Sequence, residues 1–369
     1  MNKKEVTEIK KQLTPNNCAI TRICGCYVDG EKEKKASFKD AFLSLPEEEM
    51  FKYFDIFRKS LSGNIGKNLL NMEFPLHTEE EGGSQEALLK LRDSRLTDEH
   101  LLEEFYTRVI DSYNYGENYL ILLIHSVYDI PGKSSDGSEM FDASDEVYDY
   151  IQCALSYHAD ENSFHERIRD WVVEMPEAGF LFPAFNERST DIHSLLYYSK
   201  NAESLENGLT DNLLGCVPPL TAGSQKETFN LLIEETLGED CSYDVVKNIH
   251  ENLNELLEQH ADSPDPLELD KAEVKYLFAK SGVETEKLET FDKQFDAAAG
   301  ENTTLLATNV ASSKKFEIKT AEITIQVSPE FADLIETKVI DGRTCLIIGV
   351  DDHVEINGVS AKTVITTKE

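Results

Sequence analysis

The chain opens with apolar residues at a helical spacing, and two apolar runs joined by a glycine turn follow. A helix is predicted over residues 2–13. Two strands are predicted next, at residues 18–28 and about 36–45, because turn residues separate two apolar runs. A second helix is expected from Pro46 onward, since proline followed by three glutamates suits a first helical turn.

The following segment combines helices with a strongly apolar strand. Helices are predicted near residues 84–93 and 98–113. The continuous apolar run from Tyr119 predicts a buried strand, and a polar loop is expected at residues 131–144. The later strands predicted from apolar runs are residues 147–157, 171–173, 179–185 and 192–198. This order predicts an α+β fold with a largely antiparallel sheet and packed helices on one side.

A polar stretch with proline and glycine at residues 201–223 predicts a boundary. The helices predicted beyond it are residues 224–237, 243–259, 270–282 and 284–298. The tail alternates from Phe316 and contains Asp341-Gly342 and Asn357-Gly358, which favour hairpins. The predicted domains are an α+β domain at 1–215, a helical segment at 216–300 and a small antiparallel β unit at 301–369.

The chain carries 36 basic and 70 acidic side chains, which gives a formal net charge of −34. Such a surface repels phosphate backbones and anionic lipid, so we expect no nucleic-acid binding and no membrane binding. Two explanations of the acidity stay open: a solubilising surface, and a surface that attracts a basic protein partner. The longest strongly apolar run is far shorter than the roughly 20 residues of a membrane-spanning helix.

Cysteine usage bears on the compartment. The chain has seven cysteines, an odd number spread unevenly, which does not indicate a disulfide framework. The N-terminus carries lysines and glutamates without the apolar segment of a secretory signal. We therefore expect a cytoplasmic protein with reduced thiols.

Cys18, Cys24 and Cys26 form the densest group of potentially reactive residues. Closely spaced thiolates suit zinc or copper(I), and two of these thiols could also form a redox pair. In an extended strand, however, residues two apart sit about 6–7 Å from each other, whereas zinc thiolates lie under ~4 Å apart. Only a bulge at Gly25 would close that gap. Buried structural cysteines are the favoured interpretation, and we expect no metal and no cofactor.

Three further patterns resemble known sites but differ in spacing, position or charge. Residues 62–68 carry glycines and a lysine as a phosphate loop would, but they follow a predicted helix and lack the required spacing. Residues 274–291 could form a helix-turn-helix, but its second helix would carry four acids, which oppose phosphate. Residues 158–166 gather histidines and acids without a metal-binding spacing. A turn, a helical hairpin and a solvated loop are the simpler interpretations.

A polar turn between two apolar strands concentrates Arg188, Asp191 and His193. Loops on a rigid scaffold often carry function. An enzyme of hydrolytic or thiol-dependent type would combine these residues with Cys24 and Cys26 in a site between the N-terminal sheet and the helical segment. As a catalytic triad the set is weak, because the turn residues are local and no nucleophile elbow is present. The alternative is a turn whose polar side chains serve its own hydrogen bonds.

Six strings, spread over nearly the whole chain, are long enough to be specific. They are residues 23–32, 46–54, 169–176, 179–185, 190–193 and 340–343. Together they resemble a bacterial family, domain of unknown function four-three-one-seven. The resemblance implies a cytosolic bacterial protein, and it supplies no activity, substrate or catalytic residue.

The leading functional hypothesis is a non-catalytic protein that acts through protein contacts, because no motif passes its geometric test. The acidic surface favours a basic partner. The competing hypothesis is the hydrolytic or thiol-dependent enzyme described above. The sequence leaves the substrate, the partner and the oligomeric state open.

Overall fold

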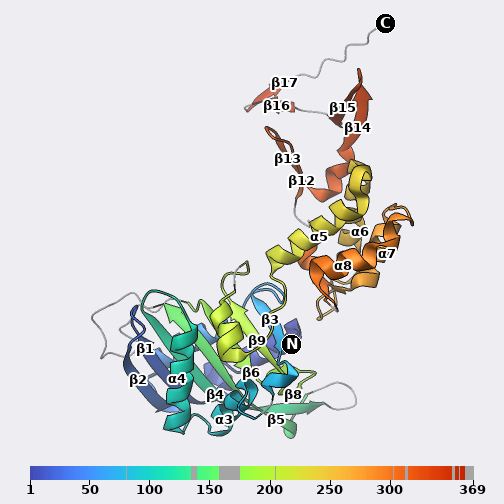
Figure 1. Cartoon of the computed structure of the whole chain (residues 1–369). Helices are drawn as coiled ribbons and strands as arrows, with labels where there is room; N and C mark the ends of the chain where they lie inside the picture. Colours follow the sequence, from blue (N-terminus) through green and yellow to red (C-terminus); the bar gives the residue numbers. More distant parts are fainter. Residues whose placement is uncertain are drawn as a thin grey trace. The chain divides into compact units, whose positions relative to one another are not determined.

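Figure 1 shows the computed structural model of the chain. It describes residues 1–79, 81–133, 139–157, 175–203, 205–301, 303–311, 315–350, 354–356 and 358–361. By its internal contacts the chain divides into two units. The first comprises Met1–Gln225 and Ser263–Pro266, and the second comprises Lys226–Asp262 and Leu267–Glu369. The expected helical segment and the expected β-rich unit both fall largely in the second unit.

The core of the first unit is a seven-stranded sheet in the order β2-β1-β4-β5-β6-β9-β3. Its strands are β1 (Ile20–Val28), β2 (Lys34–Ala41), β3 (Leu69–Glu73), β4 (Tyr119–Lys133), β5 (Glu139–Tyr157), β6 (Ala178–Phe182) and β9 (Ser194–Ser199). Every neighbouring pair is antiparallel. The predicted α+β class with its largely antiparallel sheet is therefore confirmed.

Helices cover both faces of this sheet (Figure 1), whereas the sequence predicted helices on one side. They are α1 (Lys3–Lys11), α2 (Glu47–Lys59), α3 (Ser84–Asp93), α4 (Glu99–Ser112) and the π-helical segment η4 (Gly208–Leu214). Helices α1 and α2 pack on one face, and α3, α4 and η4 pack on the other. The prediction was wrong because β4 is apolar at both alternating sets of positions. Its Leu120 and Leu122 belong to the first layer, and its Ile121 and Leu123 belong to the second.

Strands β4 and β5 form a long hairpin that extends into the region predicted to be a polar loop. Pro131 and Gly132 were expected to be loop residues, but the pairing continues through them to Lys133 opposite Glu139. Two shifts of register flank the proline, which has no N–H to donate to the ladder. Residues 134–138 and the expected strand at 171–173 lie outside the described residues.

The chain after residue 221 is mainly helical. Its helices are α5 (Ala222–Leu237), α6 (Tyr243–Gln259), α7 (Lys271–Lys280), α8 (Phe291–Ala299) and the short α9 (Ala307–Val310). The helices predicted from residues 224 and 243 are confirmed. Asp270 caps α7, because its carboxylate accepts from the Glu273 N–H and the Glu273 carboxylate accepts from the Asp270 N–H. The helix expected from residue 284 begins later, at Phe291, after a separate 3-10 turn.

Three two-stranded hairpins follow. They are β12 (Phe316–Lys319) with β13 (Thr324–Val327), β14 (Ile335–Ile340) with β15 (Arg343–Ile348), and β16 (Val354–Ile356) with β17 (Val359–Ala361). Gly342 and Gly358 have φ values of 75° and 80°, as glycines in tight hairpin turns do. The other short strands are β7 (Ala184–Asn186), β8 (Ser189–Asp191), β10 (Glu268–Leu269) and β11 (Leu305–Leu306). Among the described strands, each hairpin strand pairs only with its own hairpin partner.

His250 of α6 lies in an aromatic cluster of the second unit. Its ring centre lies 6.4 Å from that of Phe229 and 6.2 Å from that of Phe316. Burial, with a smaller contribution from Lys226, lowers the pKa of His250 below its usual 6.5. The folded unit therefore favours the neutral imidazole.

We expect the second unit to lose stability as the pH falls below about 6.5. The unfolded chain takes up a proton on His250 before the folded chain does. The contribution to stability is therefore full above that pH and is lost as the pH drops toward the folded pKa. Urea denaturation over this pH range should show a smaller loss in His250→Phe, whose ring does not titrate. An equal loss in the two proteins would contradict the prediction.

Candidate functional site

The Cys24-Gly25-Cys26 sequence lies in the middle of β1, and the structure explains its glycine. Both thiols are 0% exposed and point into the core layer that contains α4. Gly25 faces the opposite layer, where an added Cβ would overlap the ring of Phe38 on the neighbouring strand. The register of β1 has no shift at Gly25, so β1 lacks the bulge that would bring the two sulfurs together. Packing of the Phe38 ring therefore accounts for the glycine.

Burial makes these thiols poor nucleophiles. It raises the pKa of Cys24 and of Cys26 to about 12, and it also raises the pKa of Cys153 in the same layer. The Cys24 thiol donates weakly to the Leu96 carbonyl oxygen, at 3.9 Å. Because the thiolate is the reactive form of cysteine, this group does not supply a nucleophile near neutral pH.

We expect Cys24, Cys26 and Cys153 to resist alkylation in the folded protein and to react after unfolding. These three thiols should be alkylated at least about a hundredfold more slowly than the Cys241 thiol, because their alkylation requires the core to open. Cys241 is exposed and serves as the internal control. Mass spectrometry after iodoacetamide treatment, with and without denaturant, measures each site. Similar native rates at Cys24 and Cys241 would show that the layer is open to solvent.

The polar turn between β7 and β8 is held by α1. Glu187 and Arg188 are its two turn residues, and both have positive φ, 52° and 59°. The Glu187 N–H donates to the Glu5 carboxylate at 2.7 Å, and the Arg188 guanidinium binds the Glu8 carboxylate at 3.1 Å. These contacts offset the strain of two non-glycine residues in a left-handed conformation. Arg188 therefore has a structural role in this turn.

Asp191 and His193 also have local partners. The Asp191 carboxylate accepts from the Asn186 side-chain amide at 2.7 Å and from the His193 N–H at 3.0 Å. The His193 ring is 66% exposed and lies 2.7 Å from a Glu79 oxygen, and this hydrogen bond raises the pKa of His193. The structure does not bring Arg188, Asp191 and His193 into one cleft with the cysteines of β1, because those thiols have no exposed surface.

The other sequence patterns become local structure or lie outside the described residues. Residues 62–68 connect α2 to β3, and Gly63 and Gly66 have φ values of 112° and 79°. Residues 283–290, where a helix-turn-helix would place its second helix, contain a 3-10 turn. The group of histidines and acids at 158–166 lies outside the described residues. Within the described part of the chain, no three potential metal ligands gather into a group.

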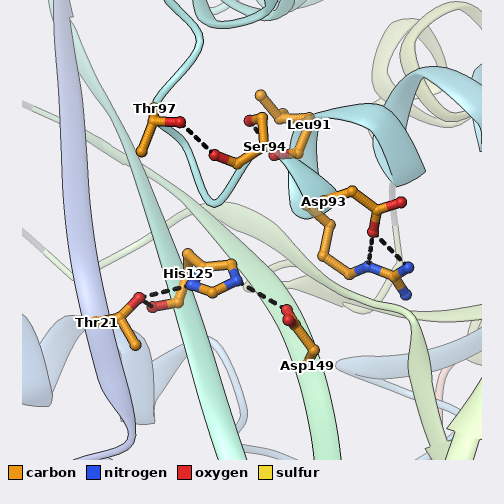
Figure 2. A network of polar contacts seen from close by, with 8 residues as sticks. Thr21, Leu91, Asp93, Ser94, Thr97, His125 and Asp149 are labelled. Carbon is orange, nitrogen blue, oxygen red and sulfur yellow. Dashed lines mark hydrogen bonds and ion pairs between the residues drawn. The ribbon is translucent and has the colours of Figure 1, made fainter.

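A hydrogen-bonded chain of Thr21, His125 and Asp149 crosses three neighbouring strands (Figure 2), and it was not predicted from the sequence. His125 Nδ1 lies 2.6 Å from the Thr21 hydroxyl oxygen, and Nε2 lies 2.8 Å from an Asp149 carboxylate oxygen. His125 is fully buried, whereas Thr21 is exposed. A hydroxyl, an imidazole and a carboxylate in this order form the set that activates an alcohol nucleophile in many hydrolases.

A β-bulge aims Thr21 at the histidine. The pairing of β1 with β4 passes from Ile20 opposite Ser126 to Arg22 opposite His125, so Thr21 is the extra residue. Bulges redirect side chains in this way and occur often beside active sites. In the sequence, the only signal of this group is a histidine that follows a continuous apolar run. Its two partners could not be identified, because they depend on strand register.

Two protonation states of His125 use these contacts differently. With a neutral ring, Nε2–H donates to Asp149 and Nδ1 accepts from the Thr21 hydroxyl, as a general base beside a nucleophile does. With a protonated ring, both ring nitrogens donate. The Thr21 hydroxyl can then donate to the His125 carbonyl oxygen, 3.1 Å away. The second state satisfies all three contacts at once, so the geometry suits a cross-strand structural link as well as catalysis.

A pocket of about 460 Å³ lies between α3 and α4. Two of its basic side chains are engaged. Arg108 donates to the Leu213 carbonyl oxygen at 2.7 Å, and Lys90 pairs with Glu86 at 2.8 Å. The lining of the pocket does not include Thr21, His125 or Asp149, so it provides no substrate site beside them.

The second candidate site is an apolar face of the β14–β15 hairpin. The register places six side chains on it, Ile335, Thr337, Val339, Thr344, Leu346 and Ile348, which we call the hairpin face. Val339, Leu346 and Ile348 are 73%, 37% and 48% exposed. The opposite face carries the charged residues Glu336, Lys338 and Arg343 together with Ile340, Cys345 and Ile347. Exposed apolar side chains that lie together mark interaction sites.

The fold and the two sites define an α+β protein with a helix-covered antiparallel sheet and an appended unit of helices and amphipathic hairpins. The chain belongs to the family described as Domain of unknown function (DUF4317), whose model matches residues 1–359. The resemblance found in the sequence is thereby confirmed. No curated protein and no solved structure matches the chain. In the described residues, no helix combines the length and the apolar character needed to cross a bilayer.

Proposed function

We propose that this chain is a non-catalytic binding protein of the bacterial cytoplasm, and that it holds other protein chains through its C-terminal hairpins. The observation that carries this proposal is the hairpin face, where Val339, Leu346 and Ile348 are exposed and the outer edges of the two strands have no neighbour among the described residues. An extended segment of a partner can add to such an edge. It gains main-chain hydrogen bonds there, and its apolar side chains pack beside those of the hairpin face. The family resemblance and seven free cysteines support the cytoplasmic location.

Energetics favour a covered hairpin. A two-stranded hairpin is marginal on its own, and a third strand or a covering layer stabilises it. Complete burial of an aliphatic side chain contributes about 1.5–3 kcal/mol. The side chains of Val339, Leu346 and Ile348 are exposed, so only part of this free energy is gained in the single chain. A partner that covers them would gain the rest.

The acidic surface supports a basic partner. A net charge of −34 raises the rate at which a basic protein meets this chain. Binding that depends on this attraction weakens as salt is added, because salt screens exposed charges beyond about 8–10 Å. Binding through the apolar face is less sensitive to salt, so a salt titration separates the two contributions.

A pair of neighbouring substitutions tests the proposal. Val339→Lys places a charge on the hairpin face, whereas Ile340→Lys places the same charge on the opposite face, where Ile340 is also exposed. We expect Val339→Lys to abolish recovery of partner proteins from a native bacterial lysate, and Ile340→Lys to retain it. Equal recovery by both variants, or no partner and no self-association of the unsubstituted protein, would refute the proposal.

A second candidate function, hydrolysis, rests on the chain of Thr21, His125 and Asp149. In this case the Thr21 hydroxyl oxygen attacks the carbonyl carbon of an ester while His125 accepts the hydroxyl proton. The ester C–O bond breaks, His125 gives the proton to the departing alcohol, and water then hydrolyses the acyl group from Thr21. Small activated esters should then be turned over, and both Thr21→Val and His125→Gln should abolish the turnover. Turnover that persists in folded Thr21→Val would exclude Thr21 as the nucleophile.

A further inference from the structure

The outer edge of β14 has no strand beside it in the described part of the chain. We propose that β14 pairs with β14 of a second copy, antiparallel and across a two-fold axis at Thr337. The inference rests on the proposed function and names the partner of the hairpin: another molecule of this chain. The result is a four-stranded sheet in which the two copies of β14 are central and the two copies of β15 are at the edges.

The sequence of β14 is self-complementary in one register. Antiparallel pairing centred on Thr337 places Glu336 opposite Lys338 of the partner subunit, and Lys338 opposite Glu336 of the partner subunit. Opposite charges directly across a strand pair stabilise the pairing. Both side chains are available, since Glu336 and Lys338 are 57% and 59% exposed and now pair with each other at 2.6 Å.

The neighbouring registers are less favourable. A two-fold axis at Glu336 or at Lys338 places that charge opposite its own copy, and like charges across a strand pair destabilise it. A shift by one residue places apolar positions opposite polar ones, because side chains alternate between the two faces. Only the register centred on Thr337 pairs opposite charges and keeps the hairpin faces of the two copies on the same side of the sheet.

The other edge of the hairpin has no such match. Arg343 is the only charged residue of β15, so pairing of two β15 edges creates no attractive charge pair. Pairing through β14 also joins the hairpin faces of the two copies into one apolar surface. The isologous contact closes after two copies, which limits assembly to a dimer.

Charge exchange within β14 tests the register. Analytical ultracentrifugation of the full chain, at a salt concentration that screens its net charge, measures the dimer dissociation constant. We expect Glu336→Lys and Lys338→Glu each to raise this constant about tenfold, because each places like charges opposite one another at two symmetric positions. The double variant Glu336→Lys, Lys338→Glu should restore the unsubstituted value to within about threefold.

Cysteine cross-linking gives an independent measurement. With Cys241 and Cys345 replaced by serine, Thr337→Cys should form a disulfide-linked dimer on mild oxidation. Facing residues of an antiparallel pair lie within the range that a disulfide spans. Val339→Cys is the control, because its copy lies four residues further along the pair, about 13 Å away.

The outcomes separate this inference from the proposed function. A protein that stays monomeric at about 100 µM refutes the dimer. The proposal is also refuted if neither charge substitution changes the dimer dissociation constant and Thr337→Cys forms no disulfide-linked dimer. If Val339→Lys abolishes the recovery of partner proteins from the lysate in either case, the proposed binding function stands without self-association. If that dependence is also missing, both proposals fail.

Discussion

Gly208→Ala is expected to destabilise the first unit by about 3 kcal/mol or more, at the upper end of overpacking effects. Gly208 begins η4, which packs against the end of α4. A Cβ added there would overlap the Ser112 carbonyl oxygen. Because that atom belongs to the backbone, no rotamer change relieves the overlap. The gain of about 1 kcal/mol in helical propensity from glycine to alanine is smaller than this cost.

Gly223→Ala is the matched control, because Gly223 also lies in a helix but its added Cβ meets the carboxylate tip of Glu203. That side chain can move, so we expect no destabilisation and at most the gain of about 1 kcal/mol in helical propensity. Since the chain has two units, hydrogen exchange of β4 and α6 peptides reports the two stabilities separately. Exchange in β4 of Gly208→Ala as slow as in the control would contradict the expected overlap.

His125→Ala is expected to destabilise the first unit by about 2–4 kcal/mol. The change opens a cavity in the central part of the sheet and leaves Thr21 and Asp149 without their shared partner. His193→Ala is the control, because His193 also contacts a carboxylate but is 66% exposed. Its loss should cost less than about 0.5 kcal/mol, as exposed ion pairs usually do.

Urea denaturation monitored by hydrogen exchange in β1 compares these two histidine variants. If His125→Ala lowered activity toward esters while leaving the exchange unchanged, the histidine would act in catalysis and not as a link between strands. Equal small effects of the two substitutions would show that β1, β4 and β5 are held by their backbone ladder alone.

Local features were predictable from the sequence because their causes lie within a few residues. The apolar run of β1 and the acidic cap at Asp270 involve neighbours only. The turn at Asp341-Gly342 likewise depends on residues that lie side by side. The helical period of α6 is also local, and its bounds match the prediction.

Features that depend on strand register were not predictable. Thr21 and His125 lie 104 residues apart, and they meet because of a bulge that leaves no mark in the sequence. Helices pack on both faces of the sheet because β4 is apolar on both sides. This pattern predicts that both sides of the strand are buried, but it does not predict which elements cover them. Arg188 was correctly located in a turn, whereas Asp191 lies in strand β8 and not in the turn. The Glu8 partner of Arg188 follows from the fold.

Residues 263–266 belong to the first unit, although the chain on both sides of them belongs to the second. The Pro264 carbonyl oxygen accepts from the Lys3 N–H at 3.4 Å, and the Asp265 carboxylate accepts from the Asn2 side chain at 3.0 Å. The polypeptide therefore crosses between the units after Gln225, after Asp262 and after Pro266. A nonsense mutation at any codon between 226 and 262 removes the hairpins and also residues 263–266, which hydrogen-bond to the start of the first helix. A truncated gene product therefore loses the hairpins proposed to bind partners and the anchoring of its N-terminus together.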